Sequence, residues 1–152
     1  MAVSSARVLI VEARYYDDIV DHLVQGAVAK LTNEGVGYKR VQVPGALEIP
    51  GAIRFAIRSM ELRASDARYA GYIALGCVIR GQTSHYDYVC ENSIGGVQKL
   101  VLEYSLASGT GILTCPNREL ALERARVDQQ DKGGWAAHAC LEMMKLKREM
   151  GL

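Results

Sequence analysis

The stretch that decides the fold is Gly71–Ile79, GYIALGCVI, together with the polar segment RGQTSH at 80–85 that follows it at once. The unbroken apolar run of Gly71–Ile79 is typical of a strand covered on both faces, as in the middle of a parallel sheet. The sequence therefore predicts a buried central strand whose carboxyl end opens directly into a polar loop.

Two strand-and-helix pairs precede this run. The first is a strand over Arg7–Ala13 and a helix that we expect to be capped by Asp17 or Asp18 and ended by Gly35. Its apolar positions recur at spacing four: Ile19, Leu23, Ala27 and Leu31. The second pair is a strand around Val41 and Val43, closed by Pro44-Gly45, and a helix with Pro50 in its first turn. The apolar positions of that helix are Ile49, Ile53, Ile57 and Met60.

Three more helices and one more strand complete the pattern from about Ser84 onward. A long helix is expected from about Ser84 to Leu106, interrupted in pattern at Gly95-Gly96, and then a strand over Gly111–Cys115. Asn117 is placed to cap a helix through about Ala125. A last helix over Gly133–Met150 has an expected apolar face of Ala136, Cys140, Met143 and Met150.

Four strands that each precede a helix imply parallel pairing, with helices on both faces of the sheet. The predicted fold is α/β: a three-layer α/β/α sandwich around a four-stranded parallel sheet, formed by one domain over residues 1–152. Ligands gather at the carboxyl ends of the strands in such sheets. That rule points to four segments: 14–17, 44–48, 80–85 and 114–118.

Composition narrows the class of protein. Hydrophobic residues make up 49% and charged residues 23% of the 152, with a net charge of +1. This balance is typical of a globular protein, and the charge does not favour nucleic acid or an anionic membrane as a partner. The start of the chain does not resemble a signal peptide, and no apolar run approaches the ~20 residues that span a bilayer. The four cysteines are widely spread and expected to be reduced, so we expect a cytoplasmic protein.

The segment at 80–85 holds the richest set of polar side chains: Arg80, Gln82, Thr83, Ser84 and His85. Backbone N–H groups at the start of a helix, together with Thr83, can cradle a phosphate. His85 is suited to proton transfer, since histidine has an unperturbed pKa of ~6.5. The alternative is that Thr83 or Ser84 merely caps the helix and that His85 lies on the surface.

The other candidates have a structural interpretation as well. Glu48 can accept hydrogen bonds from a ligand or can complement the helix dipole. Tyr15 and Tyr16 can stack on a planar ring or pack in the core or in an interface. Arg124 and Lys132 are solvated cations by default and phosphate ligands otherwise. The spacing of His22 and His138 favours structural roles, and no metal set or nucleotide-phosphate loop is present.

Long segments of this chain resemble the lumazine synthase family. They are RVLIVEARYYDDI, VPGALEIPGAI, GYIALGCVIRGQTSHYDYV, GILTCPNRELALERA and DKGGWAAHACLEM. The resemblance covers nearly the whole chain and implies a flavodoxin-like fold assembled into homo-pentamers, or a dimer of pentamers. It implies a transferase that makes 6,7-dimethyl-8-ribityllumazine, in the penultimate step of riboflavin biosynthesis, without metal or organic cofactor. Its substrates would be 5-amino-6-(D-ribitylamino)uracil and 3,4-dihydroxy-2-butanone 4-phosphate.

The resemblance also implies roles for individual residues. His85 corresponds to the proton-transfer residue, and Tyr15 to the aromatic that stacks on the pyrimidine. Binding of the ribityl chain is implied for Ala46, Leu47 and Glu48, contact with the ring edge for Cys77, Val78 and Ile79, and phosphate binding for Gln82 and Thr83. A neighbouring subunit would supply the phosphate-binding Arg124, and Lys132 would lie near the pyrimidine.

Three positions depart from the family pattern. Thr110 replaces a phenylalanine that covers the ring from the next subunit, and Tyr16 replaces an asparagine. The segment RVDQQD at 126–131 lacks the glycines common in members that build shells, and only six residues precede the first strand. We therefore expect open pentamers. Thr110 also leaves open a non-catalytic protein that binds lumazine or flavin. A flavodoxin-like redox carrier is disfavoured, because no phosphate loop rich in Ser or Thr follows the first strand.

Overall fold

The computed structural model describes residues 6–152 as alternating strands and helices. Their order along the chain is β1 (Arg7–Ala13), α1 (Asp17–Asn33), β2 (Tyr38–Val43), a 3-10 turn (Ala46–Glu48), α2 (Ile49–Glu61), β3 (Tyr69–Ile79), α3 (His85–Tyr104), β4 (Ser108–Cys115), α4 (Arg118–Ala125) and α5 (Lys132–Glu149). The strands form one sheet in the order β2-β1-β3-β4, and all three pairings are parallel.

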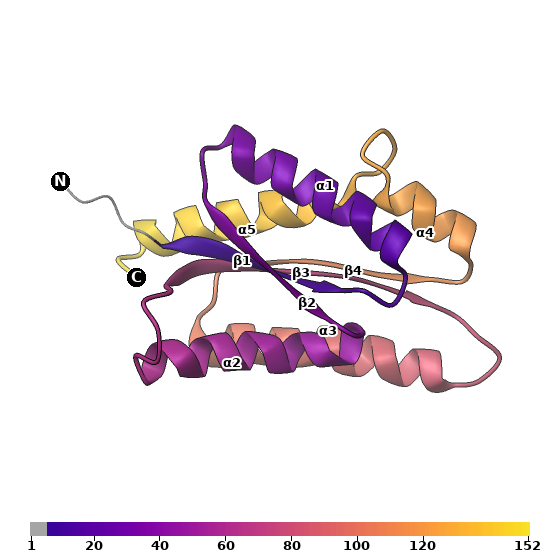
Figure 1. The fold of residues 1–152 in the computed structure, drawn as a ribbon, viewed down its shortest axis with the longest axis horizontal. Coiled ribbons are helices and arrows are strands. Elements are labelled where there is room, and N and C mark those ends of the chain that lie inside the picture. Colours follow the sequence, from indigo (N-terminus) through magenta and orange to yellow (C-terminus); the bar gives the residue numbers. More distant parts are fainter. Residues whose placement is uncertain (1–5) are drawn as a thin grey trace.

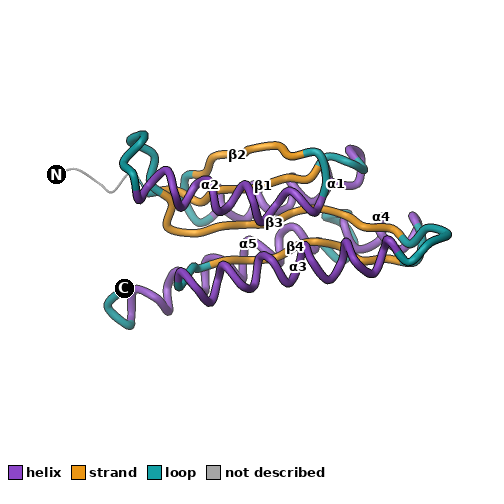
Figure 2. The backbone as a smooth tube through the Cα atoms, turned by 90° about the horizontal axis from the view of Figure 1, so that it is seen from below, coloured by secondary structure: helices purple, strands orange, loops and turns teal. Residues whose placement is uncertain are grey.

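The helices cover both faces of this sheet, as Figure 1 shows. One face carries α1, α4 and α5, and the other carries α2 and α3, which run side by side in the turned view of Figure 2. Each face buries its own apolar cluster. The predicted three-layer α/β/α sandwich with four parallel strands is confirmed.

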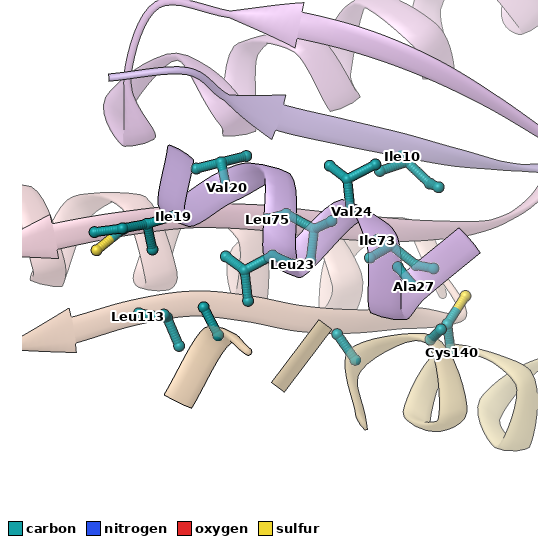
Figure 3. Close-up of a cluster of buried hydrophobic side chains, with 14 of the residues drawn as sticks. Ile10, Ile19, Val20, Leu23, Val24, Ala27, Ile73, Leu75, Leu113 and Cys140 are labelled. Atoms are coloured by element: carbon teal, nitrogen blue, oxygen red, sulfur yellow. The ribbon is translucent and has the colours of Figure 1, made fainter. Parts of the chain in front are cut away.

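β3 is the central strand that its apolar run predicts. It pairs with β1 on one side and β4 on the other, and its residues 71–78 are all buried. Alternate side chains enter opposite clusters, because successive residues of a strand point to opposite faces. Ile73 and Leu75 pack with Ile10 and Leu23 beneath α1 (Figure 3), whereas Tyr72 packs toward α2 and α3.

Two glycines allow α5 to lie close to its neighbours. A Cβ at Gly109 of β4 would be 1.7 Å from the carbonyl oxygen of Ala136, and one at Gly133 would be 1.9 Å from that of Leu23. Any larger residue at either position would push α5 away from the sheet or from α1. β4 begins at Ser108, three residues before the predicted Gly111, because its pairing with β3 starts at Tyr72 and Ser108.

Two predictions about helices were wrong. The N-cap of α1 is Tyr16, and Asp17 and Asp18 lie within the first turn, where carboxylates complement the helix dipole. On α5, Met143 and Met150 are 43% and 68% exposed, because the buried face follows the small residues Ala136, Ala137 and Cys140. The helix α3 also continues through Gly95-Gly96 without a break.

The predicted helix ends elsewhere are confirmed. Gly35 has a φ of +70° just past α1, and the Asn117 side chain accepts a hydrogen bond from the Leu120 N–H at the start of α4. Pro50 lies in the first turn of α2. None of the helices in residues 6–152 combines the length and the apolar character that crossing a membrane requires.

Candidate active site

A cavity of about 390 Å³ lies at the carboxyl ends of β1 and β3. It is bounded by the β1–α1 turn, by the segment after β2 and by the β3–α3 loop, which all lie toward the right of Figure 1. Its lining residues are Tyr15, Tyr16, Gly45, Ala46, Leu47, Glu48, Cys77, Val78, Ile79, Gly81, Thr83, His85, Tyr86 and Val89. Three of the four segments that the strand-end rule selected therefore meet at one place.

Nine of the thirteen residues singled out from the sequence line this cavity. They are Tyr15, Ala46, Leu47, Glu48, Cys77, Val78, Ile79, Thr83 and His85. Gln82 lies in the same loop between two lining residues, but its side chain is exposed and outside the lining. Thr110, Arg124 and Lys132 lie outside the lining as well, on β4, on α4 and at the first residue of α5.

The β3–α3 loop is folded back onto its own helix. The Arg80 guanidinium lies 4.4 Å from the centre of the Tyr86 ring, and its Nη2 lies 3.1 Å from Oδ1 of Asp87. Inside the loop, the backbone N–H of His85 donates to Oγ1 of Thr83 at 3.3 Å. Thr83 thus makes the local hydrogen bond that the structural interpretation expected, while Ser84 makes no side-chain cap. Residues 81–84 therefore form a short exposed loop, and Arg80 holds its beginning against the first turn of α3.

The two tyrosines after β1 differ in their surroundings. Tyr15 is 75% exposed, and its ring meets that of Tyr16 edge to face at 4.9 Å. Tyr16 is half-buried against the core beneath α1, and this burial raises the pKa of its hydroxyl. A planar ligand in the cavity can therefore stack on Tyr15, whereas Tyr16 supports the turn.

The thiols at the site are neutral. Burial, with the neighbouring thiols of Cys115 and Cys90, raises the pKa of Cys77 to about 12. Burial also raises the pKa of Cys90 and of Cys115. All four cysteines are free. Because a thiolate is the reactive form of cysteine, these groups are poor nucleophiles at neutral pH.

Three candidates that line no part of the cavity have other surroundings. Thr110 is on the face of β4 shared with Ile112, toward α2 and α3, and its Oγ1 is buried without a hydrogen-bond partner among residues 6–152. Arg124 is half-buried on α4, with Nη1 3.5 Å from the carbonyl oxygen of Leu120. Lys132 is half-buried at the start of α5. A single subunit does not bring these three side chains to the cavity.

A larger cavity, of about 640 Å³, runs along the outer edge of β2 and α2. Its lining is mostly apolar and includes Val41, Val43 and Phe55, which is 76% exposed. Specific ligand sites combine an apolar lining with a few convergent polar groups. The smaller cavity has that combination, because Thr83 and His85 join Glu48, which lines both cavities, and it is the candidate active site.

Two lining residues lie outside the segments that the sequence predicted. Tyr86 and Val89 lie on the first turns of α3, one and four residues beyond His85. The helical spacing from His85 predicts a shared face for Tyr86 and Val89 once the helix start is known. In the described part of the chain, no group of three or more His, Cys, Asp or Glu side chains is arranged to hold a metal ion.

Comparisons with known proteins agree with this architecture. The family model for 6,7-dimethyl-8-ribityllumazine synthase matches residues 5–148. A protein of that name from Afipia carboxidovorans is 48% identical over 97% of this chain and 90% of its own length. Namesakes from Paramagnetospirillum magneticum and Bartonella henselae are 44% and 49% identical over 97% and 95% of this chain, which covers 98% and 90% of their lengths. The chain belongs to the 6,7-dimethyl-8-ribityllumazine synthase family.

Proposed function

We propose that this protein is a transferase that forms 6,7-dimethyl-8-ribityllumazine, the penultimate step of riboflavin biosynthesis. It condenses 5-amino-6-(D-ribitylamino)uracil with 3,4-dihydroxy-2-butanone 4-phosphate and releases phosphate and water. The family match over residues 5–148 supports this activity. The observation that carries it to a site is the 390 Å³ cavity, where an exposed aromatic, a carboxylate and a histidine converge.

Each boundary of the cavity suits one part of the substrates. Tyr15 offers an exposed ring face to the pyrimidine, and the carboxylate of Glu48 can accept hydrogen bonds from the ribityl hydroxyls. The strand end at Cys77, Val78 and Ile79 offers its backbone to the polar edge of the ring. The loop with Gln82 and Thr83 precedes the N-terminus of α3, where backbone N–H groups and the helix dipole favour a phosphate.

The chemistry then needs proximity and one group that moves protons. The substrate amine attacks the ketone to form an imine with loss of a first water, phosphate is eliminated, and ring closure with loss of a second water completes the second ring. His85 lines the cavity beside the phosphate loop, so its imidazole can carry protons between these steps. Holding both substrates in one cavity supplies most of the rate enhancement. We assign no metal or organic cofactor to the reaction.

A neighbouring subunit completes the site in this proposal. Thr110, Arg124 and Lys132 lie away from the cavity of their own subunit, as residues donated to a neighbour must. An arrangement in which each subunit gives to the next requires head-to-tail contacts, which close into a ring. We infer a homo-pentamer, or a dimer of pentamers, in which each chain acts as one domain. The four free cysteines agree with a reducing compartment, so we place the enzyme in the cytoplasm.

Incubation of the purified protein with both substrates, followed by lumazine absorbance, tests the activity. We expect steady formation of lumazine and stoichiometric release of phosphate. Protein that binds lumazine or flavin without forming product would show the non-catalytic binding function instead.

Omitting each substrate in turn gives the background rate of that assay. The variant Arg124→Ala tests whether Arg124 binds the phosphate group of the ketone. A guanidinium–phosphate contact is charge-assisted, at about 1.5–3 kcal/mol. The variant should therefore raise KM for the phosphorylated ketone by roughly ten-fold or more and leave pyrimidine binding nearly unchanged. Equal losses for both substrates would show that Arg124 acts through the structure instead.

A further inference from the structure

The carboxylate of Glu12 is completely buried within β1, yet it is charged. Its Oε1 accepts hydrogen bonds from Nε and Nη2 of Arg14 at 3.0 and 2.7 Å. Nε of Arg40 on β2 donates to Oε2 at 2.7 Å, and Nη2 of Arg40 donates to Oε1 at 2.9 Å. Two guanidinium groups, one from the turn after β1 and one from β2, therefore hold one carboxylate.

This arrangement keeps Glu12 ionised. Burial alone disfavours a charged carboxyl, but the hydrogen bonds and positive charges of Arg40 and Arg14 outweigh it, so the pKa of Glu12 lies below its usual value. Removal of either partner would leave a buried charge that is incompletely paired. The geometry of the cluster is therefore strongly determined.

Arg14 extends the cluster into the turn that bounds the active-site cavity. Its Nη1 donates to Oδ1 of Asp21 at 2.7 Å and to the carbonyl oxygen of Asp17 at 3.2 Å, both on α1. Its backbone N–H donates to the carbonyl oxygen of Val43 at 2.9 Å. One residue therefore ties together the end of β1, the first turn of α1 and the end of β2.

The residue held next to Arg14 is the exposed Tyr15. Among the aromatic rings of residues 6–152, the ring of Tyr15 meets only that of Tyr16. The direction of the exposed Tyr15 ring therefore depends mainly on the backbone of the turn. Arg40, the other partner of Glu12, lies on β2, the strand that leads into Ala46, Leu47 and Glu48. The Glu12 cluster thus joins the two segments to which the pyrimidine and its ribityl chain are assigned, and none of its side-chain hydrogen bonds within residues 6–152 reaches the phosphate loop.

We propose that Glu12 is a positioning residue that, through Arg14 and Arg40, sets the geometry of the pyrimidine-binding half of the site. The proposal rests on the proposed function. It separates the two substrates: loss of the cluster affects binding of the pyrimidine and spares the phosphorylated ketone, which binds at the β3–α3 loop. If the cluster acted on stability alone, its loss would change KM equally for both substrates or for neither.

The test compares Glu12→Gln with Glu61→Gln. Glu61 also pairs with two arginines, Nη1 of Arg54 at 3.2 Å and of Arg58 at 3.4 Å, but it lies at the end of α2 outside the cavity lining. Glu12→Gln should raise KM for the pyrimidine roughly ten-fold, within the range that a misplacement of ~1 Å can cost. KM for the ketone phosphate should stay within about two-fold, and Glu61→Gln should change neither constant.

Arg40→Gln guards against a Glu12 variant that does not fold. Arg40 is 41% exposed, so its replacement leaves Glu12 paired with Arg14 and should raise KM for the pyrimidine to a smaller extent. Unchanged pyrimidine KM in a folded Glu12→Gln protein overturns the proposal, as do equal changes for both substrates. Where Glu12→Gln does not fold, unchanged pyrimidine KM in Arg40→Gln overturns it.

Amide hydrogen exchange at residues 15–18 provides a readout independent of activity. We expect faster exchange there in Glu12→Gln than in wild type or in Glu61→Gln, because the turn has lost its anchor. Unchanged exchange would show that Glu12 does not hold the turn. If the wild-type protein forms no lumazine, the proposed function is refuted. Faster exchange at residues 15–18 in Glu12→Gln than in wild type would still show that Glu12 anchors the turn.

Discussion

His85 is the histidine that lines the cavity, at the junction of the β3–α3 loop and α3. General acid–base groups contribute 10²–10⁴-fold to catalysis, and the substrate amine can catalyse part of its own condensation. His85→Ala should therefore lower kcat by roughly ten-fold to a thousand-fold and leave the folded structure intact. Steady-state kinetics across the pH range, with circular dichroism to check folding, measures this effect.

His22→Ala is the matched control, because His22 lies on α1 outside the cavity lining. It should leave kcat unchanged. A rate for His85→Ala equal to that of wild type at every pH would remove His85 from the mechanism.

Glu12 gives a prediction about acid stability. The pKa of its carboxyl in the folded protein lies below the usual value of 4.5, so the unfolded chain takes up the proton first as the pH falls. The stabilisation is fully present above that value and is lost as the pH drops through the lower, folded pKa. Between about pH 6 and pH 3, the urea midpoint of wild type should fall more steeply than that of Glu12→Gln, which has no proton to bind there. Parallel curves would show that Glu12 is not linked to folding.

At the scale of residues, the sequence predicts side chains that follow a strand and misses those that depend on pairing between strands. Tyr15, Glu48 and His85 each lie within six residues of the end of a recognisable strand, so the strand-end rule finds them. The Glu12 cluster escapes that rule, because Glu12 stands inside an apolar strand and Arg40 on another. Only the register, which places Glu12 opposite Gln42 and Ile10 opposite Arg40, shows that they meet.

The α4–α5 turn contains a non-glycine residue with a positive φ. Asp131 has a φ of +46°, in the left-handed region, and its side chain accepts a hydrogen bond from the Gly134 N–H at 3.1 Å. Aspartate tolerates this conformation better than most residues and is also a favourable N-cap. Residues 126–131 contain no glycine, but Asp131 supplies the left-handed conformation of the turn.

Asp131→Ala should lower the free energy of unfolding by about 1–3 kcal/mol, since alanine loses the cap and is strained at positive φ. Urea denaturation at a fixed protein concentration measures the change. Asp128→Ala is the control: Asp128 is an exposed partner of Arg126 at 3.2 Å, and its loss should cost less than about 1 kcal/mol. Equal losses in both variants would contradict this account of the turn.

At the scale of elements, periodicity predicts every helix and strand, and errors arise where packing overrides it. The run Gly71–Ile79 and the spacing of Ile19, Leu23 and Ala27 determine β3 and α1 with little help from their neighbours. By contrast, the start of β4 depends on its pairing with β3, and the buried face of α5 depends on how closely Gly109 and Ala136 approach; no single segment reveals either.

The whole molecule is expected to work as a ring. The polar groups within the cavity of one subunit include neither Arg124 nor Lys132, the two cations assigned to the substrates. Multi-angle light scattering should give the mass of five 16.6 kDa chains, or of ten if two rings pair. A fully active monomer would contradict the shared site. A particle of megadalton size would show that the turn at Asp131 permits shells after all.

Mixing two impaired variants tests the shared site most directly. In pentamers assembled from equal amounts of His85→Ala and Arg124→Ala chains, some sites combine an intact His85 from one subunit with an intact Arg124 from its neighbour. Random mixing then restores about a quarter of the wild-type sites in a closed ring. Assayed at a ketone phosphate concentration well below the KM of Arg124→Ala, the mixture should form lumazine near that fraction of the wild-type rate, and each variant alone should be slower than wild type by about ten-fold or more. Activity in the mixture no higher than the mean of the two variants would contradict a lumazine synthase site built from two subunits.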